Sequence, residues 1–430
     1  MWRLFREARH FPRSFRLLIA SQSVSVFGTL MVGMGFDLFV LHKTGSALQF
    51  SLMLAVQLVG PILFGPVMGE WIDVLKKKPL LMGLDAGRGL VSLTLCVQLL
   101  RGHTLSMGVV YGSVGFYATC EAMFDPAVAA IVPRLVDEVH LTLANTVYGA
   151  FTDVSYALGP ALGAVSYGNL GLAGVLAIDA ATYGVAVLGE AAIRLTDVWP
   201  ASVRPHVLKS YVRGFRMVWT SGPMKYLVIN DTLNHLFLFP FLSVVLPYLI
   251  IRVWHGPNWA YGLVGFIATG GSIVAASLSA RWDSSGSVVR NVSRGFWMLT
   301  AFAVFMIPFL WPTSLRTMGY LGGPWIAGYW GAANFELYLG FAIYLAFSTT
   351  WLQSTLPEKA LGRFFASRGM LHAMARLLGV LLYGFLLQTF LPEVSVALLI
   401  VALVANALVH RRYARAGQTL GPSPWIGRHP

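Results

Sequence analysis

Residues 69–78, Gly-Glu-Trp-Ile-Asp-Val-Leu-Lys-Lys-Lys, lie between the second and third of about twelve apolar segments, each close to the ~20 residues that cross a bilayer as a helix. An acid followed by a basic cluster between two membrane helices can pair with a neighbouring helix in one state and release it in another. A gate requires such a switch. The stretch therefore predicts a membrane protein that alternates between conformations.

The composition of the chain indicates the same class. It is 56% hydrophobic and only 11% charged, with a mean hydropathy of +0.67, whereas soluble domains average about 25% charged residues. The net charge of +13 is spread between apolar spans instead of forming one basic face, so we expect no nucleic-acid partner. Cys96 and Cys120 both lie inside apolar spans and predict neither a disulfide framework nor a metal site. The expected fold is all-α and membrane-spanning.

The distribution of basic residues predicts the orientation of the chain. The expected spans are 15–41, 47–72, 79–100, 105–131, 140–168, 171–193, 224–251, 259–281, 292–312, 333–356, 364–390 and 392–410. With both termini in the cytoplasm, only Lys43, Arg101, Arg252 and Arg316 face outward and the other basic loop residues face the cytoplasm, as the positive-inside rule favours. We expect a multi-pass protein of the plasma membrane, the inner membrane in a cell that has two, without a removable signal peptide.

The longest polar connection, residues 194–222, divides the chain into two halves. We expect an N-terminal six-helix half (1–193), a cytoplasmic linker (194–222), a C-terminal six-helix half (223–412) and a cytoplasmic tail (413–430). A weak repeat supports two parallel halves, since Gly45, Gly60 and Trp71 recur at one constant offset as Gly256, Gly271 and Trp282. Residues 313–332, rich in Gly, Pro and Trp, are expected to form a loop, with an interfacial lid as the alternative.

Several motifs together resemble the major facilitator superfamily over nearly the whole chain. Gly69, Asp73 and the lysines 76–78 match its signature between helices 2 and 3, followed by Asp85 and Arg88. Further matches are Thr44-Gly45-Ser46-Ala47, Phe124-Asp125-Pro126-Ala127 through Ala144-Asn145, Gly159-Pro160-Ala161-Leu162-Gly163, and Pro357 to Gly362-Arg363. This set is similar to the branch of macrolide efflux proteins and the enterobactin exporter. The resemblance implies the major facilitator fold, with twelve transmembrane helices in two six-helix pseudo-repeats, and export of a medium-sized organic molecule.

The chain also departs from that pattern. Val74 and Leu75 replace the Arg and Gly that usually follow the signature Asp, and Gly28 precedes Thr29 where this branch often has an Asp. Helix 4 carries Glu121 and Asp125 in place of the Arg common in drug antiporters. The coupling chemistry therefore has to be derived from this chain. The resemblance also implies that helix 6 packs outside the cavity, which lowers the weight of Asp179, and we expect Glu190 to pair with Arg194 one turn later.

Ionisable residues inside membrane spans are costly and indicate functional sites. Asp231 and His235 are four residues apart on helix 7 and face the same way. A histidine beside a carboxylate can load and release a proton. We therefore expect this pair to couple transport to protons, with a static packing pair as the alternative. Further cavity candidates are Asp153, His372, Arg376 and Asp37.

Arg368, His372 and Arg376 recur every fourth residue on helix 11 and form one basic stripe. Such a stripe needs acids or an anionic substrate opposite. For Arg368 we expect an ion pair in a cytoplasmic gate, and for Arg376 either internal pairing or contact with an anionic substrate. The expected gate comprises Gly69, Asp73, Lys76, Lys77, Lys78, Asp85, Arg88, Glu121, Asp125, Arg363 and Arg368.

Gly159, Pro160 and Gly163 on helix 5 predict a hinge or seal, because Pro removes a helical hydrogen bond and Gly permits close approach. Simple close packing of the helix is the alternative. The choice between them depends on what lies against these three residues.

The absence of Walker, zincin and nucleophile-elbow motifs leaves ATP hydrolysis and familiar hydrolase chemistry unsupported. We expect a transporter and no enzyme, with no cofactor and no resident metal, acting as a monomer on a small molecule. The most plausible coupling ion is the proton, with sodium or uncoupled release as alternatives. Two other functions stay open. One is ferroportin-like export of a divalent metal or transport of a lysophospholipid, with Asp37 and His235 as ligands, and the other is a membrane sensor without turnover.

Overall fold

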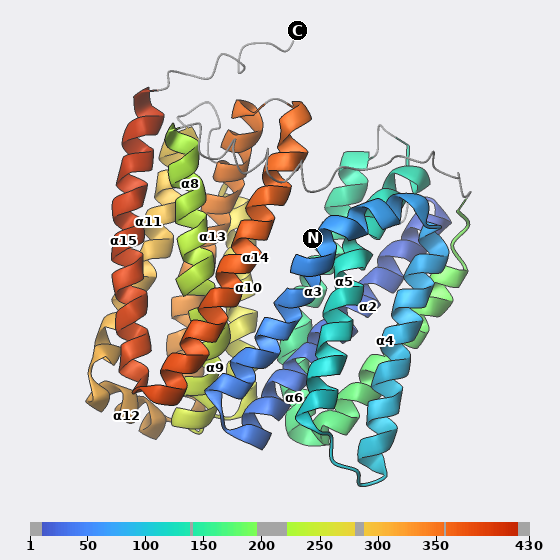
Figure 1. Cartoon of the computed structure of the whole chain (residues 1–430), viewed down its shortest axis with the longest axis horizontal. Helices are drawn as coiled ribbons and strands as arrows, with labels where there is room; N and C mark the ends of the chain where they lie inside the picture. Colours follow the sequence, from blue (N-terminus) through green and yellow to red (C-terminus); the bar gives the residue numbers. More distant parts are fainter. Residues whose placement is uncertain (1–10, 138–140, 196–221, 280–287, 357, 420–430) are drawn as a thin grey trace. The chain divides into compact units, whose positions relative to one another are not determined.

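The computed structural model describes residues 11–137, 141–195, 222–279, 288–356 and 358–419, and within these ranges it forms helices and no strand (Figure 1). The side chains of residues 63–74 and of a few residues named below lie outside the description. The chain divides into two compact units. The first comprises Met1–Thr44 and Val56–Pro205, and the second comprises Gly45–Ala55 and His206–Pro430.

Five helices carry the first six membrane spans. They are α2 (Arg13–Thr44), α3 (Ala47–Val74), α4 (Lys77–Leu100), α5 (Met107–Leu135) and α6 (Leu141–Ala191). Gly171 divides α6 into the fifth and sixth spans, because its φ of 63° and ψ of −171° interrupt the helix in a region of backbone space that glycine adopts without steric cost. Ser106 fixes the start of α5 as its N-cap, since its side chain accepts from the Val109 N–H.

The remaining six spans follow in the same order. The seventh is built from α8 (Gly222–Leu233), η2 (Asn234–Leu238), η3 (Phe241–Val245), α9 (Leu246–Tyr248) and η4 (Leu249–Val253). The others are α10 (Asn258–Ser279), α11 (Val288–Met306) with the 3-10 turn η5 (Ile307–Leu310), α13 (Gly323–Thr355), α14 (Glu358–Thr389) and α15 (Pro392–Thr419). The structure thus has the twelve-span, two-half architecture expected from the sequence.

The surfaces of these helices suit a bilayer. Within the described residues, nine helices are long and apolar enough to cross a membrane. Large apolar side chains are exposed on them, for example Leu100 at 75% and Leu188 at 73%. In water such exposure would be unfavourable, whereas lipid tails solvate it. The polar residues buried inside each unit are therefore the ones that need an explanation.

Two segments differ from those expected. The segment 313–332, expected as a loop or lid, instead forms the short helix α12 (Pro312–Leu321) and the first turns of α13. Pro312 lies in the first turn of α12, where its missing N–H costs nothing, and Gly322 with a φ of 83° separates the two helices. The last helix continues to Thr419, so residues 413–419 of the expected tail are helical. Most of the expected linker, residues 196–221, and the end of the tail, residues 420–430, lie outside the described residues.

Candidate functional site

The seventh span has an unusual backbone beside its ionisable residues. Three π-helical turns, η2, η3 and η4, follow one another along it, and such turns are rare and often occur at functional sites. Pro240 lacks an N–H that could bond to the Leu236 carbonyl oxygen one turn earlier. Gly379 of α14 lies against this oxygen, because a Cβ built on Gly379 would overlap it. The two helices therefore approach closely at the π-helical region.

Asp231 is the centre of a buried ion pair between the seventh span and α14. Its Oδ2 accepts hydrogen bonds from two nitrogens of Arg368, with the Nε at 2.9 Å and the Nη2 closer still. Its Oδ1 accepts from the Tyr344 hydroxyl of α13 at 2.7 Å. Asp231 is only 3% exposed and Arg368 only 6% exposed. A bidentate guanidinium and one hydroxyl hold this carboxylate in its charged form and fix its orientation.

Two histidines lie one turn further along the same helix pair. The rings of His235 and His372 stack with centroids 4.0 Å apart and an angle of 20° between their planes. The His235 Nδ1–H donates to the Asp231 backbone oxygen at 2.9 Å, since a carbonyl can only accept. Arg376 lies over the Phe239 ring, 5.0 Å from its centroid. We call Asp231, His235, Tyr344, Arg368, His372 and Arg376 the C-terminal cluster.

An amide network supports this cluster from the other side of the seventh span. The Asn230 Nδ2 donates to the Asn406 Oδ1 at 2.7 Å, and the Asn406 Nδ2 donates to the Asn234 Oδ1 at 2.9 Å. All three amides are buried. Hydrogen bonds between membrane helices restrict rotation of the helices about their axes. The network with α15 therefore keeps Asp231 and His235 directed toward α14.

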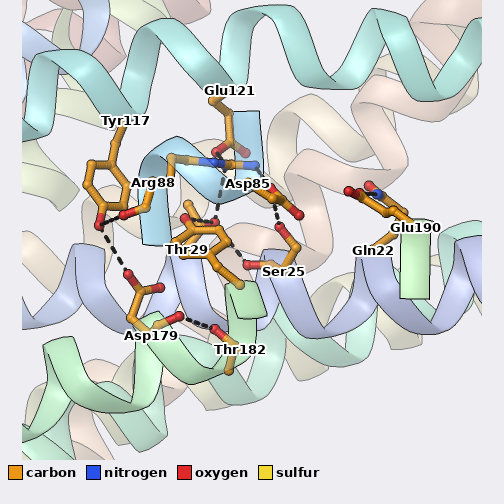
Figure 2. A network of polar contacts seen from close by, with 11 residues as sticks. Gln22, Ser25, Thr29, Asp85, Arg88, Tyr117, Glu121, Asp179, Thr182 and Glu190 are labelled. Carbon is orange, nitrogen blue, oxygen red and sulfur yellow. Dashed lines mark hydrogen bonds and ion pairs between the residues drawn. The ribbon is translucent and has the colours of Figure 1, made fainter. Parts of the chain in front are cut away.

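A second polar cluster is buried in the first unit around Arg88 of α4 (Figure 2). Its guanidinium forms a close ion pair with Asp85 and a second contact with Glu121 of α5 at 3.4 Å. The same group lies over the rings of Phe124 and Tyr183, 4.6 and 4.8 Å from their centroids. Cation–π contacts of this kind stabilise a desolvated arginine. Arg88 therefore connects three helices of the unit from a fully buried position.

Two further acids belong to this second cluster. Asp179 of α6 is 0% exposed, and its Oδ2 accepts from Ser92 and from the Tyr117 hydroxyl, the latter at 3.2 Å (Figure 2). Glu190, also on α6, accepts from the Gln22 side chain of α2 at 3.2 Å. We call the whole set the N-terminal cluster, and it comprises Gln22, Ser25, Thr29, Asp85, Arg88, Ser92, Tyr117, Glu121, Asp179 and Glu190.

The expected gate residues divide into several groups. Asp85, Arg88 and Glu121 come together as described, within the first unit. Arg368, expected to form an ion pair in the gate, pairs with Asp231 of its own half. Of the three lysines, Lys78 donates to the Ala191 and Ile193 carbonyl oxygens at the end of α6, Lys77 donates to the Leu75 oxygen, and Lys76 is the exposed N-cap of α4. Gly69, Asp73, Asp125 and Arg363 lie on helices, but their surroundings are outside the described residues.

Gly159 and Gly163 provide close packing between α6 and α2. A Cβ on Gly159 would lie 2.7 Å from the Leu30 Cβ, and one on Gly163 would lie 2.6 Å from the Met31 oxygen. The helix continues through Pro160, and within α6 only Gly171 has non-helical dihedral angles. The geometry is that of the packing alternative, and a hinge at these residues stays a prediction.

The other expected cavity residues are not drawn into either cluster. Asp37 lies on α2, and its Oδ1 is buried without a hydrogen-bond partner among the described residues. The side chain of Asp153 on α6 is outside the description. No group of three or more potential metal ligands occurs among the described residues. Among the described residues, Asp37 and His235 therefore do not belong to a group of three potential ligands that could hold a metal ion.

Sequence reasoning missed several members of the clusters. Tyr344, Asn406, Ser92 and Tyr117 are neutral, so nothing in the sequence separates them from other polar residues in apolar helices. Glu190, expected to pair with Arg194, contacts Gln22, and the Arg194 backbone N–H is bonded to the Ser14 hydroxyl. Asp179 was given low weight on the resemblance alone. The cost of an acid in an apolar helix was the signal that could have identified it.

Comparisons with known proteins agree with this architecture. The family model of the Major Facilitator Superfamily matches residues 18–380. Macrolide efflux protein A of Streptococcus pyogenes is 22% identical over 376 residues, covering 86% of this chain and 88% of that protein. The multidrug efflux pump Tap of Mycolicibacterium fortuitum is 26% identical over 390 residues, covering 84% and 87%.

Solved structures show the same fold. A bacterial homologue of the iron transporter ferroportin in an inward-facing state has a TM-score of 0.71 at 15% identity, covering 94% of this chain and 98% of that one. A bacterial homologue of the human lysosomal transporter Spinster, also inward-facing, has a TM-score of 0.67 at 13% identity, covering 94% and 96%. At these identities the likeness concerns the fold alone.

Proposed function

Because the chain belongs to the major facilitator superfamily, we propose that it is a proton-coupled exporter of a medium-sized organic molecule of the drug or siderophore class. A multi-pass membrane transporter of this superfamily moves a small molecule by alternating access between its two halves. Export is supported by the efflux proteins among the relatives. We also propose that both termini face the cytoplasm, as the distribution of Lys and Arg favours.

The observation that carries the proposal is the buried ion pair of Asp231 and Arg368 beside the stacked histidines. Charged groups inside a membrane protein are costly and mark ion or substrate pathways. A proton on Asp231 would remove its charge and replace the strong bidentate contact with a weaker neutral one. Arg368 would then need a new partner, so α14 and the seventh span would no longer be held in the same arrangement. Protonation of one carboxyl group is thereby converted into helix movement.

The histidines next to the pair can deliver that proton. The His235 Nδ1–H is held by a backbone oxygen, which leaves the Nε2 as the atom that can take up a proton. Two neutral imidazoles can stack, whereas a proton on either ring would add a third positive charge beside Arg368 and Arg376 and would be repelled by them. His235 and His372 therefore suit transient proton transfer better than storage.

Arg376 is the residue we propose to contact the substrate. Its Nε is buried without a hydrogen-bond partner among the described residues, and its guanidinium lies over Phe239. A cation beside an aromatic ring recognises an aromatic molecule that carries an acidic group.

The test is flux from proteoliposomes with and without an imposed pH gradient. The panel contains a macrolide, a catecholate siderophore, a lysophospholipid and Mn²⁺. We expect the gradient to stimulate movement of an organic compound, and we expect Asp231→Asn and His235→Ala to lose that stimulation. Asp137→Asn and His103→Ala serve as matched controls, because both residues are exposed in loops and the variants should behave as the unmodified protein.

Other outcomes would redirect or exclude the proposal. Movement of Mn²⁺ alone, or of the lysophospholipid alone, would favour the alternative cargoes. No movement of any member of the panel would favour a membrane sensor. Full gradient stimulation in both Asp231→Asn and His235→Ala would show that the C-terminal cluster is not the coupling site.

A further inference from the structure

The N-terminal cluster contains more acid than its single cation can balance. Asp85, Glu121, Asp179 and Glu190 face one guanidinium, that of Arg88. Asp85 forms a close ion pair with Arg88, and the Glu121 side chain is 37% exposed and within 3.4 Å of the same group. These two acids can be charged. Asp179 and Glu190 are 0% and 1% exposed and have no cation in hydrogen-bond contact among the described residues.

A buried carboxyl group without a cation is stable only in its neutral form, because the cost of burying an isolated charge exceeds that of binding a proton. Helices α2, α4 and α5 and the rest of α6 contribute the groups that face these two acids. Arg88 and Asp85 come from α4, Tyr117, Cys120 and Glu121 from α5, and Tyr183 from α6, whereas α2 contributes the uncharged Gln22, Ser25 and Thr29. Among these described groups Arg88 is the only cation, and Asp85 already engages it. The Lys78 ammonium of α4, near the end of α6, donates to the Ala191 and Ile193 carbonyl oxygens.

The count of hydrogens around Asp179 leads to the same conclusion. Its Oδ2, the Ser92 hydroxyl and the Tyr117 hydroxyl are in mutual contact, and the Tyr117 hydroxyl also lies 3.1 Å from the Arg88 backbone oxygen. Two hydroxyl hydrogens cannot serve these four contacts. A third hydrogen on Asp179 would serve one more contact. Asp179 would then donate to Ser92, in place of accepting from it, Ser92 to Tyr117 and Tyr117 to the Arg88 carbonyl oxygen, and only the longest contact, between Tyr117 and the Asp179 Oδ2, would carry no hydrogen.

The contact between Gln22 and Glu190 also lacks a hydrogen. The Gln22 Nε2 donates to the Glu190 Oε1 at 3.2 Å. The remaining oxygens of the two groups, the Gln22 Oε1 and the Glu190 Oε2, are both buried without a donor among the described residues. The Gln22 Oε1 can only accept a hydrogen bond, and an ionised Glu190 has no hydrogen to donate to it. A proton on the Glu190 Oε2 supplies the missing donor. The pair then becomes a closed acid–amide ring with two hydrogen bonds.

We propose that Asp179 and Glu190 form a proton-binding site in the N-terminal half, separate from the C-terminal cluster and occupied by up to one proton on each acid. Asp179 joins α6 to α4 and α5, and Glu190 joins α6 to α2. Loss of either proton places an uncompensated negative charge at one of these helix contacts and forces the contact to rearrange. The use of the site in transport rests on the proposed proton coupling, whereas its occupancy by protons does not.

The experiment is infrared spectroscopy of the purified protein in lipid as the pD is raised. A protonated carboxylic acid has a carbonyl stretch that an ionised carboxylate lacks. We expect part of this band to be present at neutral pD and to be lost in Asp179→Asn and in Glu190→Gln, each of which has the shape of the protonated acid. Asp137→Asn, at an exposed carboxylate, should leave the band unchanged.

An unchanged acid band in both variants would overturn the proposal, as would a band that disappears on addition of Na⁺ at constant pD, because the site would then bind sodium. A second measurement needs no substitution. Dicyclohexylcarbodiimide reacts with protonated carboxyl groups in apolar surroundings, and we expect it to modify Asp179 or Glu190 and to spare Asp85. Modification of other carboxyl groups only would contradict the inference. If the band behaves as expected but no flux is found, the proton site stands and the proposed transport fails.

Discussion

Removal of one partner of the Asp231–Arg368 ion pair should destabilise the protein more than removal of both. The pair is buried, with a bidentate contact and a hydroxyl on the second carboxylate oxygen. Asp231→Asn keeps the size of the side chain and an acceptor for Tyr344, but it leaves the Arg368 charge uncompensated. Arg368→Met keeps the length of the side chain and leaves the Asp231 charge uncompensated. Each single change should cost about 3–5 kcal/mol.

The double variant isolates the interaction. With both charges absent, the remaining defect is the unpaired amide NH2 group of the new Asn, which should cost about 1–3 kcal/mol. Independent effects would add to about 6–10 kcal/mol. The expected difference between the double variant and that sum is therefore several kcal/mol. Neutral hydrogen bonds between membrane helices contribute only about 0.6 kcal/mol on average, so a value of this size distinguishes an ion pair from an ordinary polar contact.

The assay is equilibrium unfolding in mixed micelles with increasing dodecyl sulfate, followed by the fluorescence of the 13 tryptophans. Tyr344→Phe is the matched control, because it removes a neutral partner from the same carboxylate and should cost at most about 1.7 kcal/mol. If the double variant loses as much stability as the two single variants added together, the two side chains do not interact, and the reasoning that links α14 to the seventh span fails.

Two further changes test the packing and the orientation. Gly379→Ala should destabilise the protein by about 1–3 kcal/mol, because its Cβ would overlap the Leu236 carbonyl oxygen; Gly369→Ala, on the same helix with nothing within 4 Å, should be neutral or slightly stabilising in the same unfolding assay. In a cysteine-free background on intact cells, a membrane-impermeant maleimide should label His103→Cys and spare Asp137→Cys. The reverse labelling pattern would place the termini outside.

The fold could be predicted from the sequence because the bilayer restricts the possible structures. Every span must be helical and about 20 residues long to satisfy its backbone in lipid. The division into two halves follows from one long polar connection and a weak repeat. The segment that differs from the expectation, residues 313–332, is a connection between spans, to which this restriction does not apply. There α12 and the start of α13 are governed by Pro312 and Gly322.

The ionisable residues could also be identified, but their partners could not. Asp231, His235, Arg368 and His372 stand out because such residues are rare in apolar helices. Spacing of four residues suggested that Asp231 faces His235, yet the carboxylate bonds to Arg368, 137 positions away, and the histidine bonds to the Asp231 backbone. Spacing along one helix reports only neighbours on that helix. The strongest partner of a buried charge comes from another helix, and its position depends on tertiary packing.

The N-terminal cluster shows a second limit of sequence reasoning. Asp85, Arg88 and Glu121 were expected to form part of a gate, and they do come together. Asp179 and Glu190 received little weight, because each was judged by the position of its helix or by its nearest basic residue in the sequence. The imbalance between four acids and one cation becomes visible only when all five side chains are known to share one interior.

The two halves repeat the same arrangement of helices but not the same chemistry. In the first unit, buried polar contacts connect the first, third, fourth and sixth spans. In the second unit they connect the corresponding seventh, ninth, tenth and twelfth spans and, through Arg368, also the eleventh. The C-terminal cluster pairs its one acid, Asp231, with Arg368 and adds two stacked histidines, to which we have assigned proton transfer. The N-terminal cluster has an excess of acids that can be neutral only by holding protons. A site that binds a proton tightly enough to keep it also releases it slowly. An exporter that stores protons in one half would therefore need a different site, in the other half, to exchange them. In the single variant Asp179→Asn the C-terminal cluster is unchanged. The number of protons carried per substrate should therefore fall, while the pH gradient still stimulates transport.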